Sequence, residues 1–147
     1  MQCERFRCTK PATVRLPEGQ VCEPHATLIA DALARAVVLD RDANTCQSCG
    51  DKDRGCQWAH VLARRVAPFI RHDPDNALAL CATCHGDFTR HPARFAEWID
   101  RARPGLRDSL RDRDRRAQYA PVRPGIEATV AELRGMLGWP MAEGGTG

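Results

Sequence analysis

Aromatic residues are scarce in this chain of 147 residues, where they make up only 5% of the sequence. A domain with so few rings builds a thin aliphatic core, and such a core usually needs a covalent or metal staple. No apolar run approaches the ~20 residues of a membrane helix, and the charged start MQCERFRCTK does not look like a secretory signal. We therefore expect a cytoplasmic protein without a membrane partner.

Lysine is nearly absent too, occurring only at Lys10 and Lys52, so that almost all basic residues are arginine. The formal net charge is only +3, but eight arginines face three aspartates between Arg101 and Arg123. Arginine suits forked contacts to phosphate, although a coding bias toward GC-rich codons would also favour it. An arginine run interleaved with aspartate is more often a solvated helix face than a DNA-binding surface, so charge supports nucleic-acid binding only weakly.

Eight cysteines can supply the staple, and in a reducing compartment their paired spacing favours zinc over disulfides. The first set has the pattern C-x4-C-x13-C-x2-H, which places two ligands on each side of a predicted hairpin with the turn PEGQ. Four such ligands satisfy tetrahedral zinc. This set comprises Cys3, Cys8, Cys22 and His25.

The second set consists of two CxxC pairs separated by 31 residues, which predicts a second structural zinc site around an inserted loop. Cys56 is left over, and its neighbour Trp58 suggests a buried thiol. The ligands of this set are Cys46, Cys49, Cys81 and Cys84.

Apolar periodicity predicts helices over residues 25–40, from Pro92, over 106–119 and over 126–137. The helix over 106–119 is charged and has little apolar face. These patterns divide the chain into five segments: a zinc ribbon at 1–27, a linker helix at 28–42, a domain with both CxxC pairs at 43–100, basic helices at 101–139 and a disordered tail at 140–147.

The loop between the two CxxC pairs carries residues suited to phosphodiester hydrolysis. Zinc at both ends would bring a strand at 56–62 against a helix beginning near Cys84, so that His60 and His85 face one cleft. His60 can act as a base near neutral pH and His85 can bind a divalent ion. Asn76 can orient a histidine, brace the loop or simply cap a turn after Pro74. Three loop arginines can grip phosphates: Arg64, Arg65 and Arg71.

The ordered motifs HVLARR, RHDPDN, LCATCH and DFTRHP resemble those of HNH endonucleases, over about residues 46–100. The resemblance implies a small zinc-stabilised α+β fold, the ββα-metal or His-Me finger, in a bacterial or phage-infected cell. It implies His60 as general base, Asn76 as the bracing residue and His85 as ligand of a catalytic Mg²⁺ or Mn²⁺. The two cysteine sets then hold two structural Zn²⁺ ions. The expected partner is double-stranded or branched DNA, and a homodimer is a further expectation.

Two positions depart from the family pattern. Ala59 and Thr89 stand where many members carry a further metal ligand. The shell of the ion could be completed by water, which Mg²⁺ tolerates, or by another side chain. The alternative is a zinc protein that binds DNA, or acts as an adaptor, without cutting it. The side chains that could complete the shell are Gln57, His72, Asp73 and His91, although His72 and His91 have no motif partner and are more simply loop residues.

Overall fold

The computed structural model describes residues 1–139, and the predicted disordered tail at 140–147 lies outside the described residues. The described chain contains five α-helices and two two-stranded sheets, so the predicted α+β class is confirmed. No helix in this part of the chain has both the length and the apolar character needed to cross a bilayer. The chain forms two compact units, Met1–Val37 with Pro124–Gly147, and Val38–Arg123.

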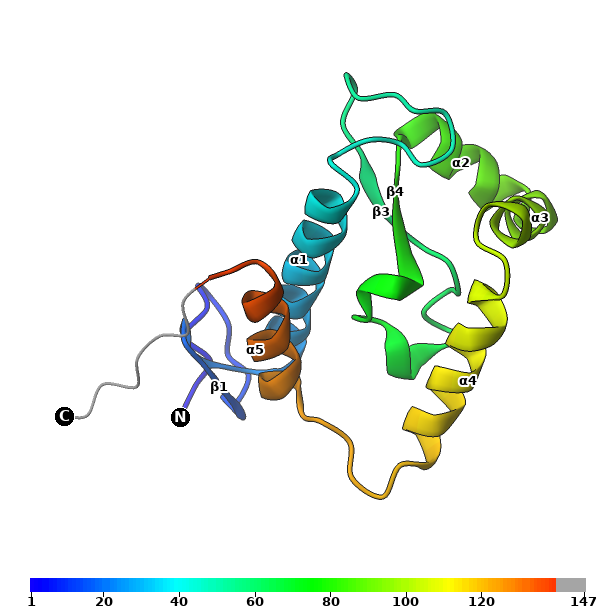
Figure 1. Ribbon diagram of the computed structural model, residues 1–147. Helices are drawn as coiled ribbons and strands as arrows, with labels where there is room; N and C mark the ends of the chain where they lie inside the picture. The colour runs from blue at the N-terminus through cyan, green and yellow to red at the C-terminus, as the bar shows by residue number, and fades with distance from the viewer. Residues whose placement is uncertain (140–147) are drawn as a thin grey trace. The chain divides into compact units, whose positions relative to one another are not determined.

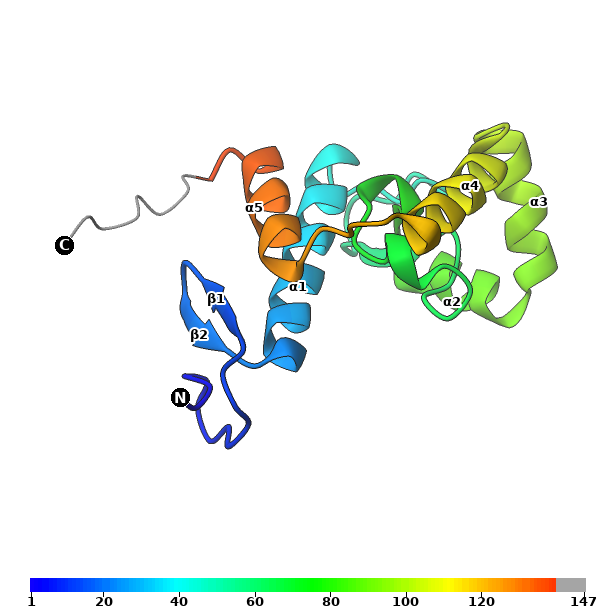
Figure 2. The same ribbon diagram turned by 90° about the horizontal axis from the view of Figure 1, so that it is seen from below.

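The first unit begins with the hairpin of β1 (Val14–Leu16) and β2 (Gly19–Val21), which Figure 2 shows beside the N-terminus. The strands are antiparallel, with Val14 opposite Val21. Gly19 is the first residue of the return strand β2. Its φ angle is +124°, which residues with a Cβ rarely adopt. Helix α1 (Glu23–Arg41) follows and starts two residues before the predicted position, with Pro24 in its first turn.

Helix α5 (Ile126–Met136) completes this unit and ends one residue before the predicted end. Its Val130 and Leu133 are buried, and Arg134 forms an ion pair with Glu18 in the β1–β2 turn. The helix packs against β1. The small hairpin is thereby held by both a helix and the thiol cluster described below.

The second unit is built on the antiparallel hairpin of β3 (Gln57–His60) and β4 (Ala77–Leu80), which lie side by side in Figure 1. Every residue of β4 is buried, which fits its continuous apolar run ALAL. Strand β3 ends at His60, two residues before the predicted end. The Leu62 N–H donates instead to the side chain of Asn76, so the chain leaves the sheet there.

The outer edge of β4 is covered by polar groups from the end of α1 and the loop that follows. The Arg41 guanidinium donates to the carbonyls of Pro74 and Ala77, at 2.8 Å each. The Asp42 carboxylate accepts from the Ala79 N–H at 2.9 Å, and the Gln47 N–H donates to the Ala79 carbonyl at 2.9 Å. Backbone groups that a two-stranded sheet would leave unpaired are satisfied in this way.

Three helices follow the hairpin: α2 (Ala82–Arg90), α3 (Pro92–Ala102) and α4 (Leu106–Tyr119). Helix α2 starts before the predicted position near Cys84, because Cys81 is its N-cap and accepts from the Cys84 N–H through Sγ. Pro92 opens α3 as predicted.

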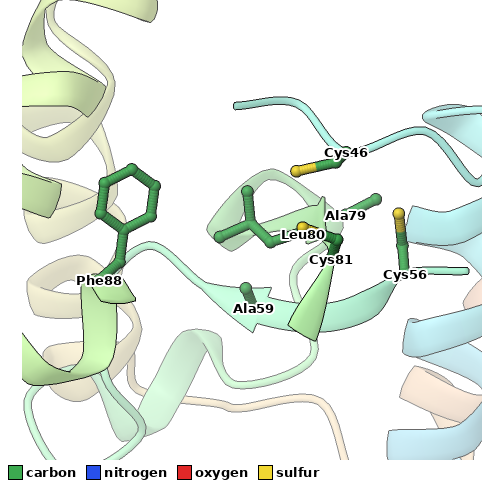
Figure 3. Close-up of a cluster of buried hydrophobic side chains, with 7 residues drawn as sticks. All are labelled: Cys46, Cys56, Ala59, Ala79, Leu80, Cys81 and Phe88. Carbon is green, nitrogen blue, oxygen red and sulfur yellow. The ribbon is translucent and has the colours of Figure 1, made fainter. Parts of the chain in front are cut away.

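Two apolar clusters hold this unit together. The first joins the strands to α2, and Figure 3 shows its members Cys46, Cys56, Ala59, Ala79, Leu80, Cys81 and Phe88. The second brings together side chains from the loop after β3, from β4, from α3 and from α4. Leu110, the buried residue of the charged helix α4, is fully buried in it. The members of the second cluster are Val61, Leu62, Ala67, Ile70, Leu78, Ile99 and Leu110.

Helix α4 also holds the loop that separates β3 from β4. Arg113 contacts the carboxylates of Asp73 and Asp75, at 3.1 and 2.7 Å. The Phe69 N–H donates to Asp114 at 2.9 Å. The loop contains two 3-10 turns, Pro68–Ile70 and Pro74–Asn76. A segment that is long in sequence is therefore fixed against a helix.

Candidate metal clusters and histidine cavity

The first unit gathers the predicted N-terminal ligands into one cluster. The ligand atoms of Cys3, Cys8, Cys22 and His25 all lie within 4.8 Å of one another. The His25 Nδ1 atom is 3.2 Å from the sulfurs of both Cys3 and Cys22, and the Cys8 and Cys22 sulfurs are 3.9 Å apart. Two sulfurs bound to tetrahedral zinc at ~2.3 Å would lie about 3.8 Å apart. The spacing fits a structural zinc site and is too long for a disulfide.

The second unit gathers the cysteines of the two CxxC pairs into a cluster. The four sulfurs of Cys46, Cys49, Cys81 and Cys84 lie within 4.8 Å of one another, and those of Cys49 and Cys81 are 3.8 Å apart. The first pair follows the end of α1, and the second spans the junction of β4 and α2. Cys56 is buried nearby and stays outside the cluster. This arrangement is also compatible with structural zinc, and it brings two distant chain segments together.

The thiols of these clusters differ in pKa. Burial opposes ionisation of Cys46, but N–H groups of its own knuckle and of Cys81 lower its pKa to about 6. Cys3 behaves alike: burial opposes ionisation, and neighbouring N–H groups with His25 lower its pKa to about 6. Burial and adjacent thiols instead raise the pKa of Cys84 to about 12. Sulfurs crowded around one point compete for ionisation, and a bound cation would favour the thiolate at every ligand.

His85 lies on the first turn of α2, directly after the last cysteine ligand. Its Nδ1 atom is 2.7 Å from Oε1 of Gln57 on β3. An amide oxygen only accepts, so Nδ1 carries the proton and Nε2 is the atom with the lone pair. Burial lowers the pKa of His85, which favours the neutral ring. The ring is therefore held in the form that binds a metal through Nε2.

His60 ends β3 and is half-buried. Its Nε2 atom donates to the Arg71 carbonyl at 3.0 Å, so the neutral ring has its lone pair on Nδ1. The ring of Trp58 lies 4.3 Å away, centroid to centroid, at 53°. A backbone contact on one nitrogen and an aromatic neighbour fix the orientation of this imidazole.

His60 and His85 line one cavity of about 640 Å³. Arg64 and Arg65, both exposed, line it as well, and so does Arg107 from α4. No carboxylate belongs to the described residues that line this cavity. Its polar character is therefore cationic and imidazole-rich, which suits an anion such as a phosphate. Its apolar wall includes Trp58, Leu80, Phe88 and Phe95.

Asn76 is completely buried and makes no part of the cavity wall. Its Oδ1 accepts from the Leu62 N–H at 2.8 Å, and its Nδ2 donates to the Leu62 carbonyl at 3.1 Å. The amide thereby pairs both backbone groups of Leu62 across the base of the loop. Of the alternatives open from sequence, bracing of the loop is the one that these contacts describe.

The remaining predicted residues lie apart from the cavity. Arg71 is not among its lining residues, although its carbonyl accepts from His60. Among the alternative ligands, Gln57 contacts His85, whereas Asp73 pairs with Arg113 and His91 lies near Asp87 at the start of α3.

The two departures from the family pattern have structural counterparts. Ala59 is 2% exposed and packs in the apolar cluster with Leu80 and Phe88. The Thr89 hydroxyl lies at the cavity and donates to the His85 carbonyl at 2.7 Å. Neither position supplies an imidazole or a carboxylate, so among the described lining residues the imidazoles are those of His60 and His85.

Sequence reasoning did not single out Arg107, which reaches the cavity from a helix 22 residues after His85. Its only sequence signal was membership in the arginine run. Its guanidinium contacts both carboxylate oxygens of Asp100, at 2.8 and 2.6 Å, which raises the Arg107 pKa. The pair presents a fixed guanidinium at the cavity.

No protein-family model, curated protein or solved structure matches this chain significantly. The resemblance to HNH endonucleases thus stays a prediction that depends on the motifs and on the geometry of this site.

Proposed function

We propose that this protein is a metal-dependent DNA endonuclease whose catalytic centre is the cavity lined by His60 and His85. The observation that carries the proposal is the meeting of these two imidazoles, 25 residues apart in sequence, in one cavity with Arg64, Arg65 and Arg107. Nucleic-acid hydrolysis needs a base, a cation site and groups that bind the phosphate, and this set of residues can supply all three.

His60 is the proposed general base. Because its Nε2 donates to the Arg71 carbonyl, Nδ1 is the atom that would take the proton from the attacking water. The base keeps this tautomer for as long as the loop carrying Arg71 keeps its position. Asn76 contributes indirectly, since it ties that loop to the end of β3 through Leu62.

His85 is the proposed ligand of a divalent ion, which would neutralise charge on the phosphate and on the leaving oxygen. Gln57 orients it by accepting from Nδ1. A single imidazole without a carboxylate is a poor donor set for Mg²⁺, which prefers oxygen, and a better one for Mn²⁺ or a later transition metal. We therefore expect Mn²⁺ to support cleavage better than Mg²⁺.

The three arginines are the proposed phosphate contacts. Arg64 and Arg65 are exposed on the loop after β3, and Arg107 is fixed by Asp100. The two four-ligand clusters are the proposed structural zinc sites. The second cluster would position the catalytic residues, because it joins the start of α2, which carries His85, to the knuckle that contacts β4.

The test is nicking of supercoiled plasmid by the zinc-loaded protein, with added Mn²⁺, Mg²⁺ or neither. Wild type should nick with Mn²⁺, and His60→Ala should lose roughly 100-fold or more of the rate. In His85→Ala, added Mn²⁺ should no longer stimulate nicking. His91→Ala is the matched control, since this exposed histidine does not line the cavity.

A second candidate function is DNA binding without cleavage. The absence of carboxylates among the described lining residues and the burial of Ala59 favour it. Wild-type protein that retards DNA in a gel with a salt-dependent affinity, yet leaves plasmid intact with every metal, would establish this alternative and exclude the nuclease.

A further inference from the structure

The first pair of cysteines encloses a short tip that the proposed nuclease does not use. Cys3 and Cys8 both belong to the N-terminal cluster, and the chain between them reads Glu-Arg-Phe-Arg. The Phe6 ring is 87% exposed, and Arg5 and Arg7 on either side of it are exposed as well. A large apolar ring on the outside of a structured turn does nothing for the core.

Backbone hydrogen bonds hold the main chain of this tip. The Cys8 N–H donates to the Arg5 carbonyl at 3.0 Å, which closes the turn, and the Glu4 N–H donates to Gln20 of β2 at 2.9 Å. The Arg7 guanidinium lies 5.0 Å from the centre of the Phe6 ring, within cation–π range. The ring thus stands on a hydrogen-bonded turn, beside a guanidinium.

Arg7 occupies a backbone position that glycine would fill more easily. Its φ angle is +58°, in the left-handed region that residues with a Cβ rarely adopt. The turn alone would be satisfied by glycine, so its geometry does not explain the choice of arginine.

The first unit carries further exposed basic residues besides those of the tip. Lys10 and Arg15 of the same unit are exposed, in addition to Arg5 and Arg7. The carboxylate of Glu4, the acidic residue of the tip segment, lies against Gly19, and the carboxylate of Glu18 pairs with Arg134. The tip therefore presents an aromatic face with positive charge on both sides.

We propose that the Arg5–Phe6–Arg7 tip binds single-stranded nucleic acid, with Phe6 stacked on a base and the arginines on the flanking phosphates. A protruding ring can reach the face of a base only where that base is unstacked, whereas the base faces of a duplex are covered. Aromatic stacking between basic residues is the usual physical basis of such binding. The inference goes beyond the nuclease proposal and does not require that the protein cleave anything.

The experiment is fluorescence anisotropy of the full zinc-loaded chain with a labelled oligothymidylate of about 16 nucleotides, without Mn²⁺. An oligouridylate and a duplex of equal length form the other arms and separate DNA, RNA and paired strands. We expect Phe6→Ala to weaken single-strand binding about tenfold and Phe6→Trp to retain it. Arg7→Gly should keep the fold and lower the salt dependence by about one phosphate contact.

Leu28→Ala is the matched control, because Leu28 is a large exposed apolar residue of the same unit, 60% exposed, and belongs to α1 rather than to the Cys3–Cys8 segment. It should leave binding unchanged. Equal affinity of wild type and Phe6→Ala for both single strands would overturn the inference. So would a result in which Phe6→Ala changes only self-association in sedimentation, since the tip would then contact a second copy of the chain. Loss of plasmid nicking in His60→Ala tests the nuclease proposal separately.

Discussion

Gln57 and His85 are 28 positions apart in the sequence, and Oε1 of Gln57 lies 2.7 Å from Nδ1 of His85. This contact joins the first residue of β3 to the first turn of α2. It gives His85 a defined tautomer, which a metal ligand needs and a surface histidine does not.

Removing this contact should weaken metal binding. In Gln57→Ala the His85 ring loses the acceptor that fixes its tautomer, so we expect about 10- to 100-fold weaker binding of Mn²⁺. Gln57→Glu should restore binding, because a carboxylate also accepts from Nδ1. Free Mn²⁺ is measured by electron paramagnetic resonance, which reports on binding without depending on cleavage. Thr83→Ala on the exposed face of α2 is the control, and equal affinities in Gln57→Ala and wild type would contradict the role.

Asn76 should be essential for stability. Asn76→Ala leaves the buried N–H and carbonyl of Leu62 without their partners, and we expect a loss of roughly 3 kcal/mol in the free energy of unfolding. Urea denaturation of the zinc-loaded protein measures it. Gln2→Ala, which removes an exposed amide, should change stability by less than about 0.5 kcal/mol. A stable Asn76→Ala protein would show that the loop closes without this brace.

The zinc content of variants should distinguish the cysteines that bind zinc from Cys56, which lies outside both clusters. The zinc-loaded protein should contain about two zinc ions per chain, one for each cluster of four ligands. Cys46→Ala should lose one zinc and unfold the unit Val38–Arg123, because structural zinc contributes directly to folding. Cys56→Ala removes another buried thiol from the same apolar cluster and should retain both ions. Elemental analysis with circular dichroism checks this, and a folded Cys46→Ala protein with two zinc ions would contradict the assignment.

Leu110 should contribute strongly to stability although it lies on a helix of mostly charged residues. It is 0% exposed and packs with Ile70, Leu78 and Ile99. Leu110→Ala should cost about 3 kcal/mol in the free energy of unfolding through the cavity it leaves. The neighbouring Ser109→Ala on the exposed face should be nearly neutral. Thermal unfolding of both variants is the measurement, and equal melting temperatures would mean that α4 is not anchored by this residue.

Much of the architecture could be predicted from the sequence because its signals are local. The spacing of cysteines predicted two groups of four ligands, and both groups assemble. Helix α4 has the predicted ends, Leu106 and Tyr119, since Gly105 before it and Pro121 after it are strong breakers. The α+β class was an expectation from the resemblance of the motifs to HNH endonucleases.

The parts that could not be predicted depend on contacts between distant residues. The strand expected at 56–62 ends at His60. The Leu62 N–H donates instead to the side chain of Asn76, which lies 14 residues further along the chain. Arg107 reaches the cavity only through the packing of α4. The tautomer of His85 depends on Gln57, and nothing in the local sequence of α2 indicates it.

The contacts of Arg41 and Asp42 with β4 have a consequence for how copies of this protein can associate. An unpaired strand edge invites another strand to add to it, in dimers that share a sheet and in fibrillar aggregates. Here the carbonyls of Pro74 and Ala77 and the N–H of Ala79 are already engaged. Strand addition at this edge would first have to displace a guanidinium and a carboxylate, so a dimer is not expected to form by pairing of β4 with a second copy of β4.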